Sequence, residues 1–120
     1  MPAPEMQEVS FDTAKPNSVL KFEIKPKTGF VATAKLDLDN DTVAKWKSVE
    51  IVGKVIEETL LPPGLYTLVI RIVGISKTPV DIDVEISLKP PKKAAEVQTI
   101  SFKKKKGSDV CQAIAFMLIA

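Results

Sequence analysis

The sequence predicts an all-β fold, namely an antiparallel β-sandwich of jelly-roll or immunoglobulin-like type with eight to nine short strands. Three observations support this prediction. Short segments alternate apolar and polar residues with period two, proline and glycine turn signals separate them at regular spacing, and no segment has a persuasive amphipathic helix pattern. A chain of 120 residues holds one such core. We therefore expect a flexible arm over residues 1–7 and a single domain over residues 8–120.

The stretch from Leu61 to Leu88 predicts a β-hairpin. A rigid Pro-Pro-Gly turn precedes its first strand, and a turn around Gly74 separates the two strands. Both strands carry their apolar residues at even positions, so direct pairing places Arg71 opposite Asp81 or Asp83. The residues expected at the centre of the buried face are Leu68, Ile70, Ile82 and Val84.

The other strands follow from the same alternation and turn chemistry. We expect a first edge strand over 8–12, a second hairpin closed by residues 26–29, and a connector over 89–95 that crosses between sheets. The remaining strand segments are 19–25, 30–38, 49–52, 55–60 and 97–102.

An acidic loop carries the one pattern typical of a metal site. Asp37, Asp39 and Asp41 stand at alternate positions, as at the start of an EF-hand calcium loop. Thr42 stands where that loop requires glycine, and Ser48 where it requires glutamate. The pattern therefore leaves two interpretations, an interstrand calcium site or a strand-end turn without metal.

The only tryptophan, Trp46, is flanked by Lys45 and Lys47. An aromatic ring between two ammonium groups is a candidate ligand-binding element. The alternative is that Trp46 covers one end of the core.

A run of lysines, Lys103 to Lys106, is expected at a turn. Such a run can contact nucleic acid or anionic lipid. The formal net charge is only +2, so we interpret the run as a solubilising turn and do not expect a nucleic acid partner.

Composition excludes several kinds of catalysis. The chain has no histidine, which removes Ser-His-Asp, Cys-His and HExxH chemistry, and its single cysteine cannot form a thiolate zinc site. No segment has the length of apolar sequence that a membrane span needs. The first residues lack a basic start and an apolar run, so we expect no secretory signal and a cytoplasmic location or a place in a larger assembly. We expect a protein that is not an enzyme.

The segment from Val110 to Ala120 is apolar on both faces and uncharged. As a strand it is either central in a covered sheet or part of an interface, because an apolar free edge aggregates. A helix is the alternative for this composition. Our interpretation is an interface strand for a second copy or another protein, with its contacts on one face: Cys111, Ala113, Ala115, Met117 and Ile119.

Part of the chain resembles the bacterial pre-peptidase C-terminal type of β-sandwich. The resemblance covers Val19 to Leu88 and depends on the order of a strand, the acidic loop, and the sequence Leu-Pro-Pro-Gly-Leu-Tyr-Thr-Leu from Leu61. It implies a secreted, non-catalytic accessory module, in some members bound to calcium.

Two functions therefore remain open. The first is a non-catalytic structural or assembly subunit that associates through the apolar C-terminal strand. The alternative is an accessory module that binds carbohydrate or another surface, with calcium as an optional stabilising ion.

Overall fold

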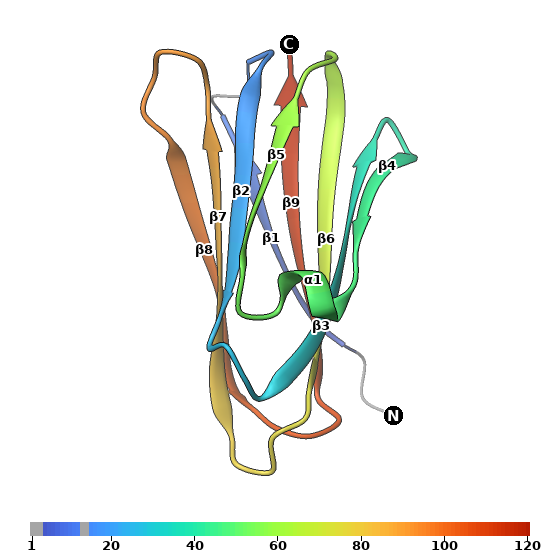
Figure 1. Cartoon of the computed structure of the whole chain (residues 1–120), viewed down its shortest axis with the longest axis vertical. Helices are drawn as coiled ribbons and strands as arrows, with labels where there is room; N and C mark the ends of the chain where they lie inside the picture. The colour runs from blue at the N-terminus through green and yellow to red at the C-terminus, as the bar shows by residue number, and fades with distance from the viewer. Residues whose placement is uncertain (1–3, 13–14) are drawn as a thin grey trace.

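The alternating strands form two layers around one apolar core. The computed structural model describes residues 4–12 and 15–120, and Figure 1 shows the strands running along the long axis of the molecule. A five-stranded sheet has the order β1-β9-β6-β3-β4, and a four-stranded sheet has the order β5-β2-β7-β8. The elements are β1 (Glu5–Phe11), β2 (Ser18–Lys25), β3 (Phe30–Leu38), β4 (Asp41–Trp46), α1 (Ser48–Ile51), β5 (Val55–Leu60), β6 (Gly64–Gly74), β7 (Val80–Lys89), β8 (Glu96–Lys105) and β9 (Val110–Ile119). The predicted β-sandwich is confirmed.

The core lies between the sheets and is built from one face of each long strand. The four residues expected at its centre, Leu68, Ile70, Ile82 and Val84, are all fully buried, as predicted. The largest side chains among their buried neighbours include Phe22 and Phe102.

The two predicted hairpins are wrong. The structure pairs β6 with β3 and β9, whereas β7 pairs with β2 and β8 in the other sheet. The chain also changes sheets between β2 and β3. The alternation in the sequence fits both arrangements. Two strands paired in one sheet turn their apolar faces to the same side, and two strands in opposite sheets turn their apolar faces toward each other across the core. Arg71 consequently lies opposite Thr33 and Gln112, and not opposite Asp81 or Asp83.

The connector over 89–95 does not cross between sheets, because β7 and β8 are antiparallel neighbours in one sheet. The segment 49–52 does not form a strand either. It belongs mostly to α1, the single helical turn between β4 and β5 (Figure 1). The Glu50 carboxylate accepts a hydrogen bond from the backbone N–H of Lys47 at 2.6 Å, which caps this turn. The Ser48 hydroxyl bonds to the backbone of Ala32 at the edge of β3.

The N-terminal strand begins within the segment that was expected to be an arm. β1 starts at Glu5 and pairs with β9 in parallel, whereas every other strand pair that the structure describes is antiparallel. Its place at the edge of the five-stranded sheet is as predicted. Residues 1–3 of the expected arm lie outside the described residues.

An ion pair joins β1 of one sheet to β8 of the other. The Lys105 Nζ and Glu5 Oε1 atoms are 2.6 Å apart, and the side chain of Lys105 is largely buried. The hydrogen bond from Lys105 lowers the pKa of Glu5, and the bond to Glu5 raises the pKa of Lys105. The pair therefore favours the charged forms of both groups in the folded state.

We expect Glu5→Gln to weaken the fold more at neutral pH than in acid. Because the pKa of Glu5 is lower in the folded state than the ordinary value of 4.5, the stabilisation is complete above that value. It is lost as pH falls through the folded-state pKa. Urea unfolding should show a loss of up to about 1 kcal/mol at pH 7, since Glu5 is partly exposed, and a smaller difference in acid. Glu57→Gln, which removes an exposed carboxylate 3.8 Å from Lys21, is the control. An equal loss at both pH values would contradict this assignment.

Candidate functional site

The C-terminal strand lies inside the five-stranded sheet, between β1 and β6. The five residues expected at an interface, Cys111, Ala113, Ala115, Met117 and Ile119, are buried in the core of the single chain. That interface assignment is therefore wrong for these side chains. Burial also raises the pKa of the Cys111 thiol, so this cysteine is not a surface nucleophile.

The opposite face of β9 joins that of β6 in what we call the apolar strip. Its members are Leu65, Val69, Ile114, Phe116 and Leu118. Leu65 lies opposite Leu118, and Val69 lies opposite Ile114, so the side chains are neighbours across the two strands. Leu118 is 62% exposed and Leu65 is 44% exposed. Val69, Ile114 and Phe116 are partly buried, and the polar Thr67 lies on the same face, opposite Phe116. The five-stranded sheet thus presents a mainly apolar strip on the side away from the core.

The outer face of the four-stranded sheet has a different character. On β7 the residues that point away from the core include Asp81, Asp83 and Glu85, and on β2 they include Lys21 and Lys25. Lys21 pairs with Glu57, and Lys103 on β8 pairs with Asp81. Antiparallel sheets usually have one such polar face in water. The two outer faces of this sandwich therefore differ in chemistry, although they belong to the same core.

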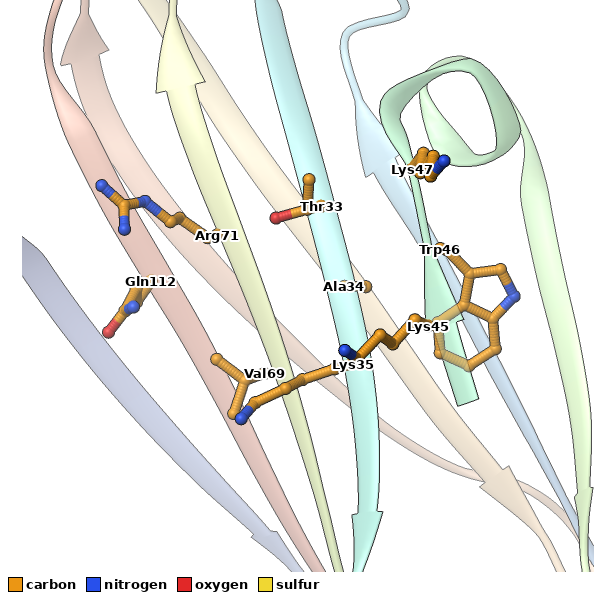
Figure 2. A pocket seen from close by; sticks show the side chains of 9 residues that line it. All are labelled: Thr33, Ala34, Lys35, Lys45, Trp46, Lys47, Val69, Arg71 and Gln112. Atoms are coloured by element: carbon orange, nitrogen blue, oxygen red, sulfur yellow. The ribbon is translucent and has the colours of Figure 1, made fainter. Parts of the chain in front are cut away.

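Next to the apolar strip, the outer face holds a cavity of about 360 Å³, which we call the cationic cavity. Four basic side chains line it, from β3, β4, β6 and the residue after β4. Figure 2 shows Lys35 extending toward Val69, and Arg71 extending toward Gln112 on β9. The lining residues are Thr33, Ala34, Lys35, Lys45, Trp46, Lys47, Val69, Arg71 and Gln112.

The strand register explains why these charges gather. Val69, Lys35 and Lys45 lie in one row across β6, β3 and β4, and Arg71 lies opposite Thr33 in the next outward row. Lys35 is 3.6 Å from Asp37. Among residues 4–12 and 15–120, Lys45, Lys47 and Arg71 have no acidic partner within ion-pair distance.

Trp46 does not stand between two lysines in the way that the sequence suggested. Lys45 is outward and exposed, whereas Trp46 is partly buried against the core. Its indole packs edge-to-face on Phe22 of the other sheet, with ring centroids 5.4 Å apart. The structure brings Lys45, Trp46 and Lys47 to one cavity, but the indole covers the rim of the core.

The acidic loop is a tight β-hairpin turn between β3 and β4. Asp39 and Asn40 have φ values of 49° and 75°, which two-residue hairpin turns of this kind require. The Asp39 carboxylate accepts the backbone N–H of Leu65 at 2.9 Å, and the Asp37 carboxylate accepts the hydroxyl of Thr42 at 2.7 Å. In the part of the chain that the structure describes, no three acidic, cysteine or histidine residues gather in a metal-binding group. Calcium binding by Asp37, Asp39 and Asp41 stays a prediction.

Among the described residues, two of the four lysines in the run from Lys103 form side-chain ion pairs, and the backbone N–H groups of Lys104 and Lys106 donate to Asp81 and Asp109. Lys103 pairs with Asp81 and Lys105 with Glu5, and both belong to the end of β8. The chain turns after them, at 106–109. Within the described residues, no helix is both long and apolar enough to cross a membrane.

Sequence reasoning missed Lys35, Thr33 and Gln112 as site residues and assigned Arg71 to another partner. A signal for Arg71 was present, because the only arginine of the chain is also the only charged residue of its strand. Lys35 and Gln112 had no such signal, since their places depend on which strands are neighbours.

Comparisons of the chain with protein families, with curated proteins and with solved structures find no match. The resemblance of Val19 to Leu88 to pre-peptidase C-terminal domains therefore stays a prediction.

Proposed function

We propose that this protein is a non-catalytic docking domain that binds another protein through the outer face of its five-stranded sheet. The observation that carries the proposal is the apolar strip. Monomeric proteins rarely leave large contiguous apolar surfaces in water, and such surfaces mark interaction sites when polar residues surround them. Here basic side chains border the strip on the β3 side, and Glu8 of β1 lies opposite Ile114 on the other.

The contrast between the two sheets supports this proposal. The charged outer face of the four-stranded sheet shows that the fold itself does not require apolar residues on an outer face. The arrangement of an apolar centre with a polar rim is that of a protein interface. The apolar residues lie on two central strands of the sheet, whose backbone is paired on both sides. The face is therefore suited to contacts through side chains rather than through strand addition.

The chemistry of the cavity favours binding over catalysis. Its lining side chains are cationic, amide, hydroxyl and apolar, and no carboxylate is among them. General acid–base chemistry usually needs a carboxylate, histidine or another group matched to neutral pH. The alternative of carbohydrate binding needs an exposed aromatic platform, and the indole of Trp46 is engaged with Phe22.

Site-specific photocrosslinking in cells of the natural source tests this function. A photoreactive amino acid at Leu118 reports on the apolar strip, and one at Val97 reports on the outer face of the four-stranded sheet. Both side chains are more than half exposed, at 62% and 54%. We expect a discrete adduct from position 118, whose mass and peptides identify the partner, and none from position 97.

A second substitution, Ile114→Asp, serves as the control for the surface. It changes the centre of the strip without touching the core face of β9, and it should remove the adduct formed at position 118. An adduct of twice the chain mass would identify a second copy as the partner. Equal crosslinking at both positions, or none at position 118, would contradict the proposal.

A further inference from the structure

We propose that the partner is an acidic protein segment, whose carboxylates enter the cationic cavity while its apolar residues cover the apolar strip. This inference rests on the proposed docking function and names the chemistry of the partner. The two surfaces are continuous, because Val69 lines the cavity and also belongs to the strip.

The first argument is an unfavourable pair of like charges. Lys35 and Lys45 lie directly opposite each other on β3 and β4, and directly opposed like charges weaken a sheet. Arg71 lies in the adjacent outward row of the same face. Lys35 lies 3.6 Å from the Asp37 carboxylate, whereas the side chains of Lys45, Lys47 and Arg71 have no ion-pair partner among the described residues. The cavity thus keeps an excess of positive charge that a bound anionic group would neutralise.

The second argument concerns which anion fits. A second copy of this chain brings the same excess of positive charge to the contact, and like charges across an interface oppose binding. Single-stranded nucleic acid binds through stacking of bases on exposed aromatic rings. Trp46 is the one aromatic residue of the cavity, and its ring packs on Phe22. A carboxylate-bearing segment needs no such platform and supplies the apolar side chains that the strip requires.

The spacing of the strands sets the length of the acidic segment that the face can bind. The row from Lys45 through Lys35 and Val69 to Ile114 crosses four neighbouring strands. Strands are about 4.8 Å apart, so the row spans on the order of 14 Å, which an extended segment of about five residues covers. Acidic residues at one end of such a segment face Lys35 and Lys45, and apolar residues at the other end face Ile114 and Phe116.

The test uses the full chain, isotope-labelled, and a synthetic eight-residue peptide of four glutamates followed by leucine, phenylalanine and two further leucines. Binding is measured at low salt by NMR titration, which detects weak complexes and locates the affected residues. We expect shifts at the amides of Lys35, Lys45, Arg71 and Ile114. The same peptide with glutamine in place of each glutamate should bind about tenfold more weakly, and added salt should reduce the difference.

Two double variants that each remove two positive charges distinguish binding in the cationic cavity from general electrostatic attraction. Lys45→Gln combined with Arg71→Gln removes two charges without leaving any described carboxylate unpaired. It should weaken binding of the glutamate peptide about tenfold. Lys21→Gln combined with Lys89→Gln removes the same charge from the outer face of the four-stranded sheet and should leave the affinity within about twofold.

Each other outcome overturns the inference in a distinct way. If the glutamate and glutamine peptides bind equally, and Phe116→Ser weakens both, the docking face stands and the acidic partner is wrong. If inorganic phosphate or a single-stranded oligonucleotide shifts the same amides and displaces the peptide at lower concentration, the cavity is a site for that ligand. If no peptide binds while crosslinking at position 118 succeeds, the partner has a different chemistry.

Discussion

Replacing Ile70 by alanine is expected to lower the free energy of unfolding by about 2 to 5 kcal/mol, and Ile82→Ala should have the same effect. Both side chains are fully buried, Ile70 in the five-stranded sheet and Ile82 in the four-stranded sheet. Truncation removes apolar contacts and leaves a cavity that a close-packed core closes only in part. Urea unfolding at neutral pH measures both losses.

Val97→Ala is the matched control. Val97 is also an aliphatic residue in a strand, but it is 54% exposed on the outer face of β8. Its replacement should change the free energy of unfolding by no more than about 0.5 kcal/mol. If Ile70→Ala and Ile82→Ala both unfold like the parent, the core is not where the structure places it.

The same two residues show how far the sequence predicts this fold. Alternation assigned Ile70 and Ile82 to the buried face, and both are buried. Alternation does not distinguish two paired strands from two strands in opposite layers, because both arrangements need the same matching of faces. The turn around Gly74 predicts a hairpin, whereas in the structure it carries the chain from one sheet to the other. Strand identity was therefore predictable and strand pairing was not.

The candidate site depends on pairing, so most of it could not be predicted. Lys35, Arg71 and Gln112 come from three strands far apart in the sequence, and they share a cavity because β3, β6 and β9 are neighbours. Only Lys45, Trp46 and Lys47 are close enough in the sequence to be recognised together. Even there, strand alternation turns Trp46 inward, away from Lys45.

The C-terminal strand shows a second limit of the sequence. Both faces of β9 are apolar, so the pattern cannot tell which face is inside. The interpretation placed the interface on the face that carries Ala113 and Ala115, whereas these small residues lie in the core opposite Ile70 and Leu68 of β6. A core combines large and small side chains to reach close packing, and the larger Ile114 and Phe116 are left on the outer face.

Lysine substitutions at the adjacent residues Met117 and Leu118 of β9 should have opposite effects on folding. Met117→Lys should abolish cooperative folding, because it places an unpaired ammonium group at a fully buried position. The cost is comparable with the whole free energy of unfolding of a typical domain, about 5 to 15 kcal/mol. Met117→Leu, which nearly conserves side-chain volume, should remain folded and lose less than about 1.5 kcal/mol. Circular dichroism during thermal unfolding separates these variants.

Leu118→Lys introduces the same charge one residue later and should leave the fold intact. Its side chain is 62% exposed, so the ammonium group reaches water, and the free energy of unfolding should change by no more than about 0.5 kcal/mol. On the proposed function, the variant loses partner binding while its unfolding transition stays that of the parent. If Leu118→Lys unfolds and Met117→Lys does not, the two faces of β9 are reversed, and both the core and the docking face have been assigned to the wrong side of the strand.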